Sequence, residues 1–293
     1  MARVYAARIL LAGLVAAALI LFLGPCLPAQ AELPSSAWAE LPSSAQAPAN
    51  PIRVLVRFRD PGDANRAQAW AGRGRHLRQI QRLGVDVIEA APATAPGLLM
   101  TLRARMDVDF AEIDRRVPPD GRPGTFHGWA GKQLRPTMVE PGDPLYPSQW
   151  HLPRVAAPVA WGTTTGASSV VVAVLDTGCD PNHPDLSAKY VAGWNFFDGN
   201  TNTADVHGHG TAVAGTAAAQ GGNGVLVASV AWGPVRIMPI RVSDATGWAY
   251  WSTVADALRW AADRGARVAN ASYNCATSAT VQSAAQYFQS KGG

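Results

Sequence analysis

The hydrophobic pattern of residues 52–117 predicts a small unit of short strands and helices. Apolar and polar residues alternate in its predicted strands, whereas Leu98, Leu99 and Leu102 share one face of a predicted helix. Asp63 is the expected cap of an earlier helix that ends before Gly84. The predicted strands are 53–58, 85–90 and 108–117, and the predicted helices are 63–83 and 96–106. This β-α-β-α-β order predicts a ferredoxin-like α/β unit.

Continuous apolar runs replace the alternation after residue 143. The run 170–175, for example, is typical of a strand that is buried on both faces. The predicted strands are 170–175, 188–195, 235–242 and 267–270, and the predicted helices are 210–220, 253–264 and 280–290. Because strands alternate with helices, residues 143–293 are predicted to form an α/β domain, a parallel β-sheet with helices on both faces.

The amino-terminal residues are typical of an export signal. Arg3 and Arg8 give a positively charged start, an apolar stretch follows at 9–23, and Ala29-Gln-Ala31 fits a small-residue cleavage site. Residues 1–31 are therefore predicted to be a signal peptide. The mature protein is expected to be extracellular or periplasmic, with no stable membrane partner after signal removal. A retained membrane anchor is the alternative, although the apolar stretch is short for a spanning helix.

Two further segments are expected to lie outside the folded units. Residues 32–51 contain the sequence Ala-Glu-Leu-Pro-Ser-Ser-Ala twice and are predicted to be a linker. Residues 118–142 are rich in Pro and Gly and are predicted to be an exposed connector that holds a maturation cleavage site.

Charge argues against nucleic acid as a partner. Residues 53–142 carry 15 Lys and Arg against 10 Asp and Glu, while residues 143–293 carry 8 against 9. The larger unit therefore lacks the basic patch that nucleic-acid binding needs.

Three residues are candidates for chemistry in the larger unit. Asp176 directly follows one apolar run and Ser272 follows another, so both are expected at the edge where parallel strands end. His209 precedes a helix of small residues. A buried carboxylate that holds one imidazole nitrogen aims the other nitrogen, which is how a general base is oriented.

The motifs around these residues resemble those of the subtilisin-like serine peptidases, particularly the secreted, thermitase-like bacterial members. The matching segments are Val172-Ala-Val-Leu-Asp176-Thr-Gly178, Asn182-His-Pro-Asp-Leu186, His209-Gly-Thr211 with Ala214-Gly215, and Val268-Ala-Asn270-Ala-Ser272-Tyr273. They occur in the order of that family. The resemblance covers residues 143–293 and, more loosely, residues 53–117.

The resemblance implies a serine endopeptidase precursor that acts on polypeptides. Asp176 would orient His209, and His209 would be the general base toward a serine. Ser272, Tyr273 and Asn274 would lie on an edge that pairs with the substrate backbone. Residues 52–117 would be the inhibitory propeptide, which binds its own catalytic domain.

The nucleophile that the family uses is missing from residues 210–293. Neither its Gly-Thr-Ser motif, followed by Met or Leu and Ala, nor its oxyanion Asn occurs there. In subtilisin, loss of the nucleophile alone costs about 10⁶ in turnover. The chain is therefore expected to be a C-terminally truncated fragment without peptidase activity.

No cofactor is expected for catalysis. His207 and His209 lack a third ligand at a spacing that suits a catalytic metal. The resemblance implies a structural Ca²⁺ site formed by Asp143, Asp185 and Asn223, whose oxygen atoms suit this ion. The alternative is that these three are solvated turn residues, because the glycine-rich loop 220–227 offers few side-chain ligands.

Other readings stay open. Cys179 and Cys275 each lie three residues past a site residue, so a disulfide between them is one expected arrangement and two thiols the other. The chain could also be a catalytically inactive protease inhibitor or binding module, or a metal-dependent hydrolase. DNA downstream of codon 293 distinguishes the first of these from a fragment, and stoichiometric zinc would support the last.

Overall fold

A computed structural model describes residues 50–60, 62, 66–119 and 138–293. The predicted signal peptide, nearly all of the predicted linker and most of the connector lie outside these residues. Within the described ranges, no helix has the length and apolar character needed to cross a lipid bilayer.

The smaller unit is a four-stranded antiparallel sheet with one helix on it. The strands lie in the order β2-β3-β1-β4. Helix α2 packs on one face, where Leu98 and Leu102 contact Val54, Val56 and Ile88. The elements are β1 (Ile52–Phe58), β2 (Arg75–Ile80), β3 (Val85–Ala90), α2 (Ala95–Arg103) and β4 (Val108–Ile113).

The predicted helix 63–83 is wrong. Its place is taken by a short 3-10 turn, η2 (Arg66–Ala69), and by β2, which pairs with β3. Gly74 lets the strands approach, because a Cβ there would lie 2.6 Å from Ile88 Cγ2. Arginine favours helices in isolation, but here long-range strand pairing outweighs that preference. The chain order is therefore β, 3-10 turn, β, β, α, β, which has one strand more than predicted. The antiparallel sheet order β4-β1-β3-β2 is that of the predicted ferredoxin-like unit, with its first helix reduced to η2.

The larger unit contains the predicted parallel sheet. Its strands lie in the order β10-β6-β8-β7, and every neighbouring pair is parallel. The strands are β6 (Val171–Asp176), β7 (Trp194–Asn195), β8 (Arg236–Arg241) and β10 (Val268–Ala271). The predicted strand 188–195 is mostly wrong, because a 3-10 turn, η4 (Ser187–Lys189), occupies its start and only β7 is extended.

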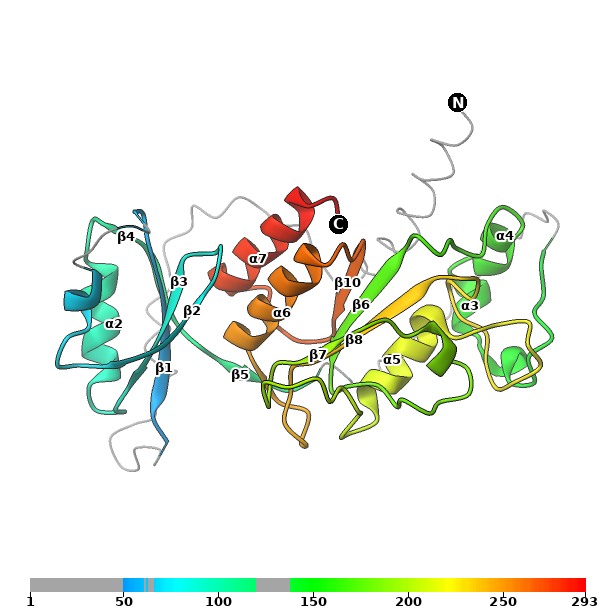
Figure 1. The fold of residues 1–293 in the computed structure, drawn as a ribbon, viewed down its shortest axis with the longest axis horizontal. Helices are drawn as coiled ribbons and strands as arrows, with labels where there is room; N and C mark the ends of the chain where they lie inside the picture. The colour runs from blue at the N-terminus through cyan, green and yellow to red at the C-terminus, as the bar shows by residue number, and fades with distance from the viewer. Residues whose placement is uncertain (1–49, 61, 63–65, 120–137) are drawn as a thin grey trace.

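Helices cover both faces of this sheet (Figure 1). In β6, Ala173 and Leu175 share a core with α6 (Trp251–Asp263) and α7 (Ala279–Ser290). Val172 and Val174 point to the other face, toward α5 (His209–Ala218). Successive side chains of β6 point to opposite faces of the sheet, and both faces are covered by helices, so residues 170–175 are apolar throughout.

Residues 143–161 wrap one end of the larger unit. Three short turns of helix lie there: η3 (Tyr146–Ser148), α3 (His151–Arg154) and α4 (Ala157–Trp161). Leu152, Ala157 and Trp161 pack with Ala228 in a separate small core.

The two units share one hydrophobic core. Leu55 and Val87 of the small sheet lie in the same buried cluster as Val254 and Leu258 of α6. A two-stranded antiparallel sheet also joins them, in which β5 (Arg116–Val117) pairs with β9 (Ala249–Tyr250). The face of the small sheet opposite α2 is thus buried against the larger unit (Figure 1).

Candidate active site

Asp176 and His209 form a hydrogen-bonded pair at the carboxyl end of the sheet. Asp176 is the last residue of β6 and is fully buried, while His209 is the first residue of α5. His209 Nδ1 lies 2.7 Å from Asp176 Oδ1, and the backbone amide of Thr177 donates to the same oxygen at 2.8 Å. Because the carboxylate holds Nδ1, the imidazole is oriented for proton transfer at Nε2.

Glycines make this approach of strand and helix possible. A Cβ on Gly210 would overlap the carbonyl oxygen of Gly178 and would lie 3.0 Å from Asp176 Cβ. Gly178 itself has φ +109°, a conformation that other residues rarely adopt. Because Gly178 and Gly210 have no side chains, the acid and the imidazole can come within hydrogen-bonding distance.

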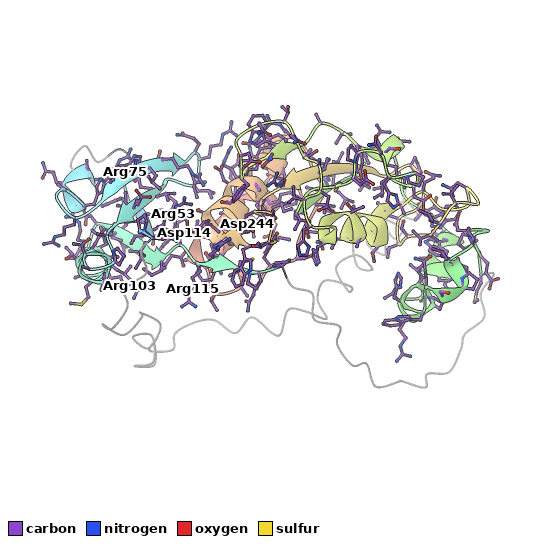
Figure 2. The ribbon with its side chains drawn as sticks, turned by 90° about the horizontal axis from the view of Figure 1, so that it is seen from below. Arg53, Arg75, Arg103, Asp114, Arg115 and Asp244 are labelled. Atoms are coloured by element: carbon purple, nitrogen blue, oxygen red, sulfur yellow. The ribbon has the colours of Figure 1, made fainter. Side chains whose placement is uncertain are left out.

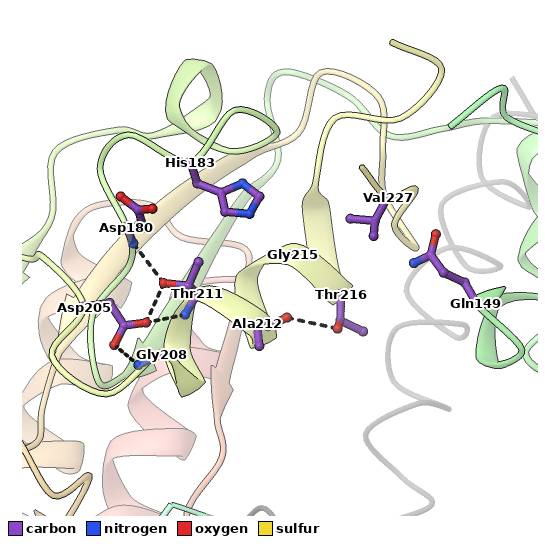
Figure 3. A pocket seen from close by; sticks show the side chains of 10 residues that line it. All are labelled: Gln149, Asp180, His183, Asp205, Gly208, Thr211, Ala212, Gly215, Thr216 and Val227. Carbon is purple, nitrogen blue, oxygen red and sulfur yellow. Dashed lines mark hydrogen bonds between the residues drawn. The ribbon is translucent and has the colours of Figure 1, made fainter. Parts of the chain in front are cut away.

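Asp205, which the sequence motifs do not single out, ties the strand end to the start of α5. Its Oδ1 accepts hydrogen bonds from Thr177 Oγ1 at 2.7 Å and from the amides of His207 and Gly208 at 3.0 and 2.8 Å. Figure 3 shows the bonds that join Asp205 to Gly208 and Thr211. Its Oδ2 accepts from the amide of Thr211 at 2.8 Å and from its hydroxyl at 2.5 Å. Burial raises the pKa of Asp205, but these hydrogen bonds lower it further, to about 2.

A local signal for Asp205 exists in the sequence. The N-cap of α5 is Gly208, which has no side chain to satisfy the first amides of the helix. An Asp three residues before a glycine N-cap can supply that acceptor and also complements the helix dipole. Asp205 therefore fixes the helix turn that carries His209.

One pocket in the described part of the chain lies near this pair, and neither Asp176 nor His209 lines it. It has a volume of about 620 Å³ and lies along the outer side of α5 (Figure 3). Its lining residues are Gln149, Asp180, His183, Asp205, Gly208, Thr211, Ala212, Gly215, Thr216 and Val227. It shares Asp205, Gly208 and Thr211 with the network above.

Ser272, Tyr273 and Asn274 lie at the same edge of the sheet as Asp176. They follow β10, which pairs in parallel with β6. The Ser272 hydroxyl accepts a hydrogen bond from Asn270 Nδ2 at 2.9 Å, and the Asn274 carbonyl accepts one from Trp251 Nε1 at 3.2 Å. Tyr273 is buried and forms an isolated antiparallel bridge with Pro119, so a chain segment already lies along this edge.

Asp143, Asp185 and Asn223 also come together. Asp143 accepts hydrogen bonds from the amides of Gly222, Asn223 and Gly224 at 2.7, 3.1 and 3.2 Å. Asp185 accepts from Asn223 Nδ2 at 3.1 Å and from the amide of Val227 at 3.1 Å. Both carboxylates are buried, and every hydrogen bond that the structure records to them comes from a neutral N–H group. No group of three or more His, Cys, Asp or Glu side chains among the described residues is arranged to hold a metal.

Cys179 and Cys275 are not joined by a disulfide. Cys179 packs in the core on the α5 face of the sheet, whereas Cys275 packs against the core on the α6 and α7 face. Although β6 and β10 are neighbours, the chain after each strand turns to a different side. The expected disulfide is therefore wrong.

Comparison with known proteins finds one family that residues 167–292 resemble. They match the sequence profile described as Peptidase S8, the subtilase family. Thermitase from Thermoactinomyces vulgaris is 38% identical over 154 residues, which are 52% of this chain and 54% of that protein. A thermophilic serine proteinase from Bacillus sp. (strain AK1) is 41% identical over 134 residues, 45% of this chain and 33% of that protein.

A solved structure extends the similarity to the smaller unit. Fervidolysin from Fervidobacterium pennivorans, a keratinolytic enzyme related to subtilisin, aligns with 83% of this chain and 39% of its own, with a TM-score of 0.63 and 27% identity. The expected subtilisin-like α/β fold is thereby confirmed. The chain spans about half or less of the length of these relatives.

Proposed function

We propose that this chain, whose residues 167–292 match the subtilase family, carries the acid and base of a serine endopeptidase. The observation that carries the proposal is the 2.7 Å hydrogen bond between His209 Nδ1 and the buried carboxylate of Asp176. A serine hydroxyl would pass its proton to His209 Nε2 as its oxygen attacks a peptide carbonyl. His209 would then return the proton to the leaving amine, and water would release the acyl group.

Asp176 would contribute to this mechanism through electrostatic stabilisation of His209. Its ionised carboxylate holds the imidazole in one tautomer and stabilises the imidazolium that forms when His209 takes the proton. Burial removes water from around the pair, so the attraction between carboxylate and imidazolium is stronger than at a protein surface. The substrate class that follows is a polypeptide.

Residues 1–293 alone are proposed to be inactive, because the sequence after His209 lacks the Gly-Thr-Ser motif of the nucleophile. A fluorophosphonate probe on the purified chain tests this statement, and no labelling is expected. Labelling that disappears in His209→Ala would contradict it.

The protease proposal itself is tested on the chain extended by its downstream coding sequence. The extended protein is expected to react with the same probe and to cleave casein, and Asp176→Ala and His209→Ala are each expected to lower turnover by a factor of at least about 10⁴. His76→Ala is the matched control, because His76 and Asp86 form a similar 2.9 Å pair in the smaller unit. An extended protein that is inert while correctly folded would overturn the assignment.

Residues 52–117 are proposed to be an inhibitory propeptide. Support comes from the β5 strand paired with β9 and from the bridge of Pro119 with Tyr273, since strand addition is a general mode of peptide recognition. Two carboxylates add to the docking: Glu112 accepts hydrogen bonds from the first amides of α7, and Asp114 from Ser252 in α6.

A second candidate function is inhibition in trans, and the same docked strand favours it. An inhibitor is expected to block an active subtilase at a 1:1 ratio and to survive the incubation intact. If residues 52–117 are instead a propeptide, they are expected to stay bound to residues 143–293 of the same chain, and the added subtilase is expected to remain active. Inhibition at a 1:1 ratio would therefore favour the inhibitor.

A structural Ca²⁺ is proposed at Asp143, Asp185 and Asn223. Two buried carboxylates joined by one Asn, with only neutral donors around them, provide the oxygen atoms and the negative charge that Ca²⁺ needs. Chelation with EGTA is expected to lower the midpoint of thermal unfolding by several degrees, and Asp185→Asn to abolish that response. An unchanged midpoint would show that these are turn residues.

Export is proposed from residues 1–31. Amino-terminal sequencing of protein recovered outside the cytoplasm is expected to start at Glu32. Recovery of the intact chain from the membrane fraction would instead favour an anchor.

A further inference from the structure

Arginines stacked on aromatic rings line the junction between the two units. All three rings belong to residues 248–251, at β9 and the start of α6. The pairs, with the distance from guanidinium carbon to ring centre, are Arg53 and Tyr250 at 4.4 Å, Arg115 and Trp251 at 5.5 Å, and Arg116 and Trp248 at 5.8 Å. Figure 2 shows Arg53, Asp114, Arg115 and Asp244 along this junction. Such stacking favours a cation over a neutral side chain.

Arg116 is also paired with the carboxylate of Asp244, through Nη2 and Oδ2. The other oxygen of Asp244 accepts hydrogen bonds from the Thr246 amide at 2.9 Å, the Thr246 hydroxyl at 2.7 Å and the Trp248 amide at 3.1 Å. Asp244 therefore holds the turn that carries Trp248 with bonds that do not involve Arg116. The carboxylate is therefore oriented by the turn itself, independently of its contact with Arg116.

The segment that contains Arg116 pairs with β9 as an added strand, in the way that an extended peptide binds to the edge of a sheet. Arg116 pairs with Tyr250 and Val117 with Ala249 in the antiparallel register of β5 and β9. The Val117 side chain is buried in the shared core, whereas that of Arg116 is 46% exposed. A Cβ on Gly247 would lie 2.8 Å from Pro119 Cγ, so the segment runs directly over the turn.

We propose that Asp244 and Trp248 form an arginine-selective subsite for extended peptides. The residue selected is the one directly before an apolar residue that enters the core position of Val117. This inference rests on the proposed function, in which residues 116–119 occupy the place of a substrate, and it narrows the substrate class to polypeptides that contain arginine. A planar guanidinium can stack on the indole and still reach the carboxylate, which the compact ammonium of lysine does less well.

Binding in trans tests the subsite directly. The full chain with Val117→Asp carries a charge at a buried position, which displaces its own segment and leaves Asp244 and Trp248 unchanged. A fluorescent peptide Glu-Ile-Asp-Arg-Arg-Val-Pro-Pro, a copy of residues 112–119, is titrated against it by anisotropy. Alanine in place of the second arginine is expected to weaken binding about tenfold, about 1.4 kcal/mol, and lysine about threefold.

A second substitution in the same background separates selection from general attraction. Asp244→Asn is expected to bring the ratio between the arginine and alanine peptides close to one. Asp256→Asn is the matched control, because Asp256 is an acidic residue of α6 that pairs with Arg78 and Arg259 instead. Equal binding of both peptides, binding of neither, or a preference that survives Asp244→Asn would overturn the proposal.

A measurement in cis covers the case in which Val117→Asp does not fold. In the otherwise unaltered chain, the Trp251 amide donates to the Arg115 carbonyl at 3.0 Å, and its hydrogen exchange reports docking of the segment. Arg116→Ala and Asp244→Asn are each expected to speed this exchange about tenfold, and the double variant no more than either alone. Arg75→Ala, which removes an exposed ion pair with Glu89, is the control. Unchanged exchange in Arg116→Ala would contradict the proposal.

Neither measurement uses hydrolysis, so the two proposals can fail separately. If the chain binds the arginine peptide selectively but its extended form never cleaves peptides, the subsite proposal is supported and the protease proposal is contradicted. If the extended protein is active but binds and cleaves the alanine peptide as well as the arginine peptide, the protease proposal is supported and the subsite proposal is contradicted.

Discussion

At the scale of single residues, the positions that orient the base extend beyond the acid–base pair. Asp176 and His209 could be predicted to meet, because their motifs, order and spacing indicate a strand end and a helix start. Asp205 could not, since its role depends on five hydrogen bonds from residues that the fold brings together. The same holds for Asp244, whose partner Arg116 is distant in sequence.

The charge of Asp205 should stabilise the larger unit. Asp205→Asn is expected to lower the free energy of unfolding by about 2 kcal/mol at neutral pH, because the charged acceptor of several hydrogen bonds is lost. The folded pKa of about 2 lies below the unfolded value of 3.8, so this stabilisation is present above about pH 4 and is lost as the pH falls toward 2. Urea unfolding at several pH values measures the difference.

Asp198 provides the control for that measurement. It lies in the same loop, pairs with Arg241 and has a side chain that is 42% exposed. Asp198→Asn is expected to lower the free energy by only about 1 kcal/mol, because its carboxylate is partly exposed to water and the asparagine carbonyl oxygen can still accept from Arg241. A loss in Asp205→Asn that is no larger than in Asp198→Asn, or that persists at pH 2, would contradict the assigned role.

At the scale of elements, the contact of α5 with β6 decides where His209 lies. Gly210→Ala is expected to destabilise the unit by about 3 kcal/mol or more, because the new methyl group would overlap a backbone carbonyl that cannot move freely. Under the proposed function, the same substitution in the chain extended by its downstream coding sequence should also lower turnover by displacing the imidazole. Thermal unfolding and the fluorophosphonate reaction measure the two effects.

Gly215 offers a matched substitution in the same helix. A Cβ there would meet nothing within 4 Å, so Gly215→Ala is expected to stabilise the helix by about 0.5–1 kcal/mol. If Gly210→Ala and Gly215→Ala change the stability alike, helix propensity explains the effect, and close packing at Gly210 does not determine the position of His209.

The elements that the sequence predicted correctly are those with a strong local pattern. The apolar run of β6 and the helical periodicity of α6 and α7 needed no tertiary information. The failures have physical causes of two kinds. Residues 75–80 form a strand because β3 and the acidic partners of Arg75 and Arg78 lie beside them. The pairing of β5 with β9 joins residues more than 130 positions apart, which no local pattern records.

At the scale of the whole molecule, the smaller unit completes the larger one. Helices α6 and α7 would expose apolar residues if the small sheet were removed, since both share its core. Glu112 and Asp114 lie two residues apart in one segment. Glu112 accepts hydrogen bonds from the amino-terminal end of α7, and Asp114 accepts one from the amino-terminal end of α6. Carboxylates at these ends complement the helix dipoles and satisfy amides that have no partner within the helix. Residues 52–117 therefore supply both apolar cover and polar caps.

This junction should respond to pH through Asp114. Burial raises its pKa to about 6, although the hydrogen bonds from Ser252 and the charges of Arg53 and Arg78 lower it. Once the units separate, the exposed carboxyl returns to an ordinary value near 4. The docked state therefore holds a proton between pH 4 and pH 6 that the separated state has released. Docking should be favoured at pH 4 and should weaken by up to about 3 kcal/mol as the pH rises through 6.

Hydrogen exchange at the Trp251 amide, corrected for the intrinsic pH dependence of exchange, measures this change. Protection is expected to fall between pH 4.5 and pH 7 in the unaltered chain and to stay constant in Asp114→Asn, which cannot ionise. Glu112→Gln is the control, because it removes the carboxylate at α7 and leaves Asp114 in place; its protection should be lower throughout but should keep the same slope. Protection that rises with pH would mean that the ionised caps at α6 outweigh the cost of burying the charge, and that the docked strand is released in acid and not at neutral pH.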